Sequence, residues 1–158
     1  MARINPDDTG KQRSHSTRWL CEDDLQSCVN LDRISLNGLW SAEQWRSELL
    51  EPGRICIGLH LAGTLVAMAS GWLVLDELQI NVVAVDPTQR RHGLGTAVLE
   101  ELIEEARRRG AKRATLEVAS CNQAAIALYE RCGFLTSGTR RAYYSDGRDA
   151  LIQWIDLN

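Results

Sequence analysis

The sequence is most informative between residues 82 and 96, which read Val82-Val83-Ala84-Val85-Asp86-Pro87-Thr88-Gln89-Arg90-Arg91-His92-Gly93-Leu94-Gly95-Thr96. The first four residues are apolar and mostly β-branched, which is typical of a buried strand. A proline turn and a basic, glycine-spaced loop follow. The loop leads directly into a long amphipathic helix, so strand, loop and helix meet at one point.

This order predicts a phosphate-binding loop. Glycines let the backbone approach a ligand closely, and the first N–H groups of a helix are unpaired and lie at the positive end of its dipole. Two adjacent arginines add positive charge there. The residues expected to hold a phosphate-bearing ligand are Arg90, Arg91, His92, Gly93, Leu94, Gly95 and Thr96.

Composition limits the class of protein. A chain of 158 residues is long enough to bury a core as one domain, and a net charge of −3 argues against nonspecific nucleic-acid binding. The five cysteines form an odd set without a C-x-x-C pair, which favours a reducing cytoplasm over disulfides or a metal site. No apolar run is long enough to suggest a membrane span. Nothing indicates an oligomeric state.

The chain divides into a short tail and one domain. Residues 1–16 are polar, so we expect a flexible tail there and a folded domain over residues 17–158. If Met1 is removed, Ala2 becomes the N-terminal residue.

Hydrophobic patterns and turn residues predict an α/β domain. Before the basic loop we expect a strand, two helices and an antiparallel meander of three strands, over residues 17–21, 22–36, 41–50, 54–61, 64–75 and 77–85. After it we expect a helix, a strand parallel to the preceding one, a helix and a hairpin, over residues 93–109, 113–119, 122–132, 135–144 and 149–157.

Two nucleotide-binding motifs do not fit the loop. A dinucleotide-binding fingerprint needs a third glycine and a preceding parallel sheet, whereas here antiparallel strands precede the loop. A Walker loop needs Gly-Lys-Ser/Thr, which is also missing.

The order of elements and two further motifs resemble the GCN5-related N-acetyltransferase (GNAT) family, and within it the RimI-type ribosomal-protein-alanine N-acetyltransferases. The first motif is Leu116-Glu117-Val118, followed by the run from Asn122 to Phe134. The second is Arg140-Arg141-Ala142-Tyr143-Tyr144 with Asp146-Gly147-Arg148-Asp149-Ala150. The resemblance extends from about Thr17 to the last residue. It implies a mixed, mostly antiparallel sheet, flanked by helices and splayed around acetyl-coenzyme A.

The resemblance also implies how acetyl-coenzyme A would bind. The glycine loop would hold its pyrophosphate, and the backbone of Val83, Ala84 and Val85 would pair with its pantetheine arm. A local splay of the strands would leave a backbone N–H, that of Val83, free for the thioester oxygen. Asn122 would contact the cofactor, although its position also suits a helix cap.

Two residues match the catalytic positions of the RimI-type enzymes. Glu117 faces away from Leu116 and Val118 and would be the general base, acting directly or through water; the alternative is a sheet glutamate paired with an arginine. Tyr129 would be the general acid for the leaving thiolate; the alternative is a core tyrosine. Glu77, at the start of the strand that leads to the glycine loop, is the second candidate for the base and would lie on the substrate side.

Aromatic residues are candidates for holding an acceptor peptide. Tyr143 and Tyr144 in the final hairpin would clasp a peptide N-terminus, unless they serve only edge packing, and Trp40 would form the opposite wall. Ala119 and Ala142 depart from the family pattern, which often has arginine and asparagine there. Both departures concern the acceptor side.

The resemblance therefore implies transfer of acetyl from acetyl-coenzyme A to the N-terminal α-amine of a protein, namely the alanine of a small-subunit ribosomal protein. An α-amine, with a pKa of about 7.7–8.0, loses its proton more readily than a lysine with a pKa of about 10.4. The alternatives are a lysine or small-amine acetyltransferase of the same fold, and a noncatalytic coenzyme A-binding module.

Overall fold

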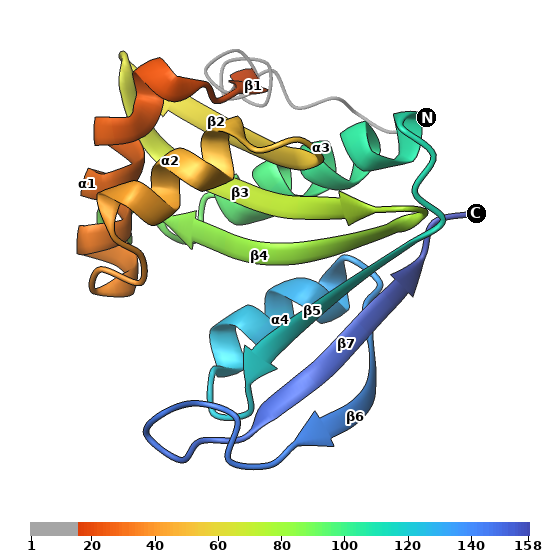
Figure 1. Ribbon diagram of the computed structural model, residues 1–158. Coiled ribbons are helices and arrows are strands. Elements are labelled where there is room, and N and C mark those ends of the chain that lie inside the picture. The colour runs from red at the N-terminus through yellow and green to blue at the C-terminus, as the bar shows by residue number, and fades with distance from the viewer. Residues whose placement is uncertain (1–15) are drawn as a thin grey trace, which may run out of the picture.

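A seven-stranded mixed sheet runs through the molecule in the order β1-β2-β3-β4-β5-β7-β6 (Figure 1). The computed structural model describes residues 16–158; the rest of the expected tail, with Ala2, lies outside the described residues. The strands are β1 (Ser16–Trp19), β2 (Arg54–Leu61), β3 (Thr64–Val74), β4 (Glu77–Val85), β5 (Arg113–Ala119), β6 (Leu135–Arg140) and β7 (Ala150–Asp156). All neighbouring strands are antiparallel except β4 and β5. The expected mixed, mostly antiparallel sheet is confirmed.

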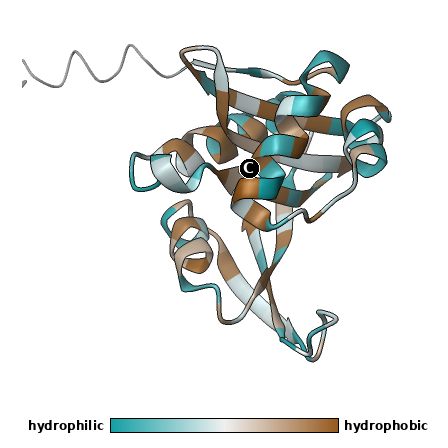
Figure 2. Ribbon diagram, turned by 90° about the vertical axis from the view of Figure 1, so that its left-hand side faces the viewer, coloured by the Kyte–Doolittle hydropathy of each residue, from teal (hydrophilic) through white to brown (hydrophobic). Residues whose placement is uncertain are grey.

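Helices cover both faces of this sheet (Figure 1). They are α1 (Leu25–Leu36), α2 (Ala42–Leu50), α3 (Leu94–Arg108) and α4 (Gln123–Arg131), with short 3-10 turns at Glu22–Asp24 and Pro87–Gln89. One buried core joins α3 and α4 to the sheet, and a second joins α1 and α2 to its other face. Hydrophobic and hydrophilic segments alternate along the helices, as expected for elements packed on one side only (Figure 2).

Helix caps follow the sequence closely. Ser41 precedes α2 and forms the predicted capping box, since its Oγ accepts from Gln44 N at 3.2 Å and Gln44 Oε1 accepts from Ser41 N at 2.8 Å. Asn37 ends α1 in the left-handed conformation, with φ 56°. These caps confirm the predicted boundary between the first two helices.

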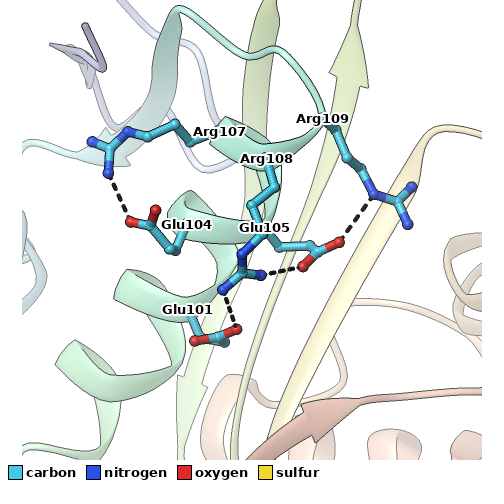
Figure 3. A network of polar contacts seen from close by, with 6 residues as sticks. All are labelled: Glu101, Glu104, Glu105, Arg107, Arg108 and Arg109. Carbon is cyan, nitrogen blue, oxygen red and sulfur yellow. Dashed lines mark hydrogen bonds and ion pairs between the residues drawn. The ribbon is translucent and has the colours of Figure 1, made fainter.

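The expected faces of α3 are also confirmed. Its buried residues include Val98, Leu99, Leu102, Ile103 and Ala106. The opposite face carries ion pairs that join Glu101, Glu104 and Glu105 to Arg107, Arg108 and Arg109, among them the predicted Glu105–Arg109 pair at 3.2 Å (Figure 3). The arginines complement the helix dipole at this end.

The final hairpin is shorter than the sequence suggested. The pairing of β6 with β7 ends at Arg140 and Ala150, so Tyr143 and Tyr144 lie in a connecting loop and not in a strand. Ala142 has a φ of 48°, and its N–H donates to Asp149 Oδ1 at 2.9 Å. A left-handed residue whose N–H is bonded to a side chain cannot continue the ladder. The predicted strand over residues 135–144 is therefore wrong beyond Arg140.

The sheet opens between β4 and β5. These strands pair only at Glu77–Arg113, Leu78–Ala114 and Gln79–Thr115, and they diverge beyond that point (Figure 1). The rest of β4 still pairs with β3, but no strand among residues 16–158 lies along its other edge. The predicted splay is thus present, and it separates the sheet into two parts joined at one end.

Three further observations concern the described residues. No helix among them is long and apolar enough to cross a membrane. No group of three or more potential metal ligands occurs among residues 16–158. The five cysteines are free, as their pattern in the sequence predicts.

Candidate active site

A cavity of about 650 Å³ lies where β4 and β5 separate. Five segments form it: the end of α1, the second half of β4, the glycine loop, the first turn of α3 and one face of α4. Its lining residues are Ser35, Leu36, Val83, Ala84, Val85, Gln89, Arg90, Arg91, Gly93, Leu94, Gly95, Thr96, Asn122, Ala124, Ala125, Ala127, Leu128, Tyr129 and Arg131. The structure thus brings the predicted phosphate loop and the predicted cofactor strand to one cavity.

The loop places unpaired N–H groups at the cavity. Arg91 and Gly93 are both left-handed, with φ 67° and 74°, so the backbone reverses just before α3 begins. The first intrahelical bond is from Ala97 N to Gly93 O at 3.0 Å, so the N–H groups before it have no carbonyl of the helix to bind. The positive end of the helix dipole and two arginines therefore face the same space.

One loop residue and several α4 residues differ from the prediction. His92 is exposed and does not line the cavity. Sequence reasoning missed the face of α4 formed by Ala124, Leu128 and Arg131, which repeats at helical spacing and adds a third arginine to the cavity. The available signal was this helical spacing of two apolar residues followed by a cation. Ser35 and Leu36 carried no local signal, because only the packing of α1 brings them there.

The edge of β4 supplies backbone groups. Val83, Ala84 and Val85 line the cavity on the side where β5 is missing. Strands in this position can pair with an extended ligand through their backbone amides and carbonyls. The geometry therefore suits a linear, amide-containing ligand.

Asn122 acts as a cap and also lines the cavity. Its Oδ1 accepts a hydrogen bond from Ala125 N at 3.2 Å at the start of α4. Both roles considered for this residue are compatible with its position.

Tyr129 forms part of the cavity wall from α4. Tyr129 is 8% exposed, and the centre of its ring lies 5.9 Å from the centre of the Phe134 ring. Burial raises the pKa of Tyr129 to about 12, with a smaller contribution from nearby Tyr144. The phenol therefore stays protonated at neutral pH and is available as a proton donor.

Glu117 lies on β5, facing away from the core that holds Leu116 and Val118. Its Oε1 is 2.9 Å from Arg140 Nε, so the ion pair considered for this residue is present. Tyr143 lies near this carboxylate, and interaction with Glu117 is the main cause that raises the pKa of Tyr143. Glu117 does not line the cavity itself.

The two tyrosines of the β6–β7 loop connect Glu117 with Tyr129. Their rings contact each other edge to face at 5.1 Å. Burial, followed by the charge of Glu117, raises the pKa of Tyr144. Because the charge of Glu117 acts on Tyr144, and Tyr144 in turn acts on Tyr129, these three side chains lie in one region of the structure.

The other two acceptor candidates lie elsewhere. The ring of Trp40 packs on that of Trp45 at 4.8 Å, and the backbone N–H of Trp40 donates to Oδ2 of the buried Asp32 at 3.0 Å. Glu77 begins β4 in register with Arg113, where the two strands are still paired, and it does not line the cavity. The structure does not bring Glu77 to the cavity wall that contains Tyr129.

The residues present fit coenzyme A. Three arginines and a free helix N-terminus match a phosphate-rich end, and the unpaired edge of β4 matches an arm of linked amides. A buried phenol then lies at the wall of the same cavity.

Comparisons with known proteins agree with this geometry. Residues 15–134 match the acetyltransferase (GNAT) family. The ribosomal protein bS18-alanine N-acetyltransferase of Escherichia coli K12 is 46% identical over 140 residues, covering 85% of this chain and 93% of its own. The N-alpha-acetyltransferase RimI of Mycobacterium tuberculosis is 34% identical over 134 residues, covering 80% and 83%.

A solved structure shows the same similarity in three dimensions. The crystal structure of the ribosomal-protein-S18-alanine N-acetyltransferase from Escherichia coli superposes with a TM-score of 0.84 at 35% identity, covering 91% of this chain and 94% of that one. The predicted resemblance is therefore confirmed, and the chain belongs to the GNAT family of acetyltransferases.

Proposed function

We propose that this protein transfers the acetyl group of acetyl-coenzyme A to the α-amine of a protein N-terminus, and that its acceptor is the N-terminal alanine of ribosomal protein bS18. The observation that carries the proposal is the cavity at the splay of β4 and β5, where a phosphate loop, an unpaired strand edge and Tyr129 meet. The name of the Escherichia coli K12 relative supports the choice of acceptor, and the name of the Mycobacterium tuberculosis relative supports transfer to an α-amine.

When bound, acetyl-coenzyme A supplies an acetyl group activated as a thioester. The first turn of α3, with Arg90 and Arg91, holds the phosphates, and the edge of β4 holds the arm. A backbone N–H near Val83 donates to the thioester oxygen, where negative charge develops during attack. Each of these groups is in place before the acceptor arrives.

Two side chains move the protons. The Glu117 carboxylate accepts a proton from the acceptor nitrogen, and Tyr129 Oη donates its proton to the departing sulfur. Arg140 and Tyr143 already lie next to the Glu117 carboxylate. An acceptor amine would therefore reach this carboxylate from beside these two side chains. Tyr143 is 49% exposed and Tyr144 is partly buried, so the β6–β7 loop can present aromatic surface to the acceptor peptide. The acetyltransferase domain would comprise residues 17–158.

A panel of acceptors tests the proposal. The protein is incubated with acetyl-coenzyme A and a bS18 N-terminal peptide that begins with alanine, and the acetylated site is read by mass spectrometry. Matched controls are the same peptide with a blocked N-terminus and an internal lysine, the peptide with its first alanine replaced, and a polyamine. We expect transfer to the free alanine amine and loss of transfer in Tyr129→Phe.

Other results would replace the proposal. Transfer to the lysine or the polyamine would indicate a side-chain or small-amine acetyltransferase of the same fold. Tight binding of coenzyme A without transfer to any acceptor would indicate a noncatalytic binding module.

A further inference from the structure

A β-bulge in β4 lies at the point where the sheet opens. Ser70 of β3 pairs with Val82, but Gly71 pairs with Ile80, so Asn81 is an extra residue in the strand. Such a bulge twists the strand and changes which face its side chains occupy. Leu78 and Ile80 accordingly pack with α3, whereas Val82 and Ala84 pack with α1 and α2.

The bulge lies between the part of β4 that pairs with β5 and the part of β4 that lines the cavity. The last β4–β5 pair is Gln79 with Thr115, two residues before Asn81. Val83, Ala84 and Val85 line the cavity directly after it. The direction in which their backbone N–H groups point therefore depends on how the bulge is held.

A buried carboxylate on α2 holds the bulge. Glu48 is 5% exposed, and its Oε1 accepts a hydrogen bond from Asn81 Nδ2 at 3.1 Å. Its Oε2 lies 3.7 Å from Arg54 Nη1. A buried carboxylate is costly unless it is paired, and an apolar side chain would pack here at lower cost. Stability alone therefore gives no reason for an acidic residue at this position.

We propose that Glu48 is a positioning residue for acetyl transfer, which it promotes by fixing the bulge at Asn81 and thereby aiming the β4 backbone at the thioester oxygen. The inference rests on the proposed function. Glu48 does not line the cavity, and of its two side-chain partners, Asn81 and Arg54, only Asn81 belongs to β4. A carboxylate is purely an acceptor, which also fixes the orientation of the Asn81 amide.

Kinetics and ligand binding of four variants test this role. Glu48→Ala and Asn81→Ala remove the hydrogen bond, whereas Glu48→Gln keeps an acceptor oxygen for Asn81. Complete loss of an oxyanion donor lowers kcat by about 10²–10³-fold, so misdirection of one should lower kcat by roughly tenfold in both alanine variants. The Glu48→Gln variant should stay within about twofold of the wild type. Glu51→Gln is the matched control, because Glu51 also pairs with Arg54, at 3.3 Å.

Calorimetry without an acceptor distinguishes a misdirected backbone donor from a general loss of cofactor binding. Coenzyme A lacks the acetyl oxygen, so its affinity should be unchanged in Asn81→Ala, while acetyl-coenzyme A should bind about three- to tenfold more weakly, the worth of one hydrogen bond. Asn81 is exposed, so this variant should fold even if Glu48→Ala does not.

The outcomes are distinct. Wild-type kcat in Asn81→Ala, or an equal loss of affinity for both ligands, would overturn the role of Glu48. A wild-type protein that acetylates no acceptor would overturn the proposed function instead. In that case, a selective loss of affinity for acetyl-coenzyme A in Asn81→Ala would still show that the bulge positions a donor to the acetyl oxygen.

Discussion

Tyr129 combines a buried ring with a hydroxyl at the cavity wall. Replacing it with phenylalanine removes only the oxygen, so the fold and the affinity for coenzyme A should be retained. Loss of a general acid should lower kcat by about 10²-fold or more. Steady-state kinetics and calorimetry on the same sample check both expectations; a kcat within threefold of the wild type would assign Tyr129 to the core alone.

Glu117 has two roles to distinguish, since it is paired with Arg140. If it is the base, Glu117→Gln should lower kcat/KM by about 10²-fold, whereas Arg140→Gln, which leaves the carboxylate in place, should lower it far less. If the ion pair is only structural, both variants should show similar, small losses of stability and near-normal kinetics. Parallel kinetics and urea unfolding of the two variants decide the matter.

Asp24 gives a prediction about stability and pH. A hydrogen bond from Arg18 is the main cause that lowers the pKa of Asp24 to about 2, and burial opposes it. Because the folded pKa lies below the unfolded value, the ion pair stabilises the protein fully above about pH 4, and this contribution is lost as the pH falls toward 2. The difference in unfolding free energy between wild type and Asp24→Asn should therefore shrink between pH 5 and pH 2.5. A constant difference would contradict this.

Among the elements, the glycine loop contains a strained residue, Arg91, that lines the cavity. Arg91 is left-handed, a conformation that costs about 1–2 kcal/mol for a residue other than glycine. In Arg91→Gly, relief of this strain is offset by the freer unfolded chain, so the unfolding free energy should change by less than about 1 kcal/mol. The KM for acetyl-coenzyme A should rise about three- to fivefold, because an exposed cation near the phosphates is lost. Arg91→Lys keeps the charge and is the control; an unchanged KM in Arg91→Gly would contradict a phosphate role.

The sequence predicted most elements because their signals are local. The capping box at Ser41, the stop at Asn37 and the apolar face of α3 each depend on residues within a few positions of one another. The end of β6 could not be predicted in this way, since it depends on a bond between Ala142 and Asp149.

The site was predictable to a similar extent. The loop was identified from a motif within one segment, and Tyr129 from the resemblance to the family; both line the cavity. The bulge at Asn81 was missed, because apolar residues continue on both sides of it and nothing in the strand itself marks the change of face. Its fixation by Glu48 depends on a contact between residues 33 positions apart.

For the whole molecule, the open edge of β4 predicts a change in backbone protection. Amide hydrogens of Val83, Ala84 and Val85 that have no strand beside them should exchange more slowly when coenzyme A pairs with this edge. Hydrogen exchange with mass spectrometry, with and without coenzyme A, measures this. The β2–β3 ladder is the internal control and should change little, and equal slowing everywhere would argue for global stabilisation without pairing.

Within the described residues, β4 and β5 pair at only three positions, so the strand pairing between the two parts of the sheet is short. A ligand that bridges the parts shifts the folding equilibrium by about 2.7 kcal/mol when its concentration is a hundred times its dissociation constant. We therefore expect the protein without coenzyme A to be cleaved faster by proteases than the protein saturated with it, so that its stability depends on the supply of its ligand.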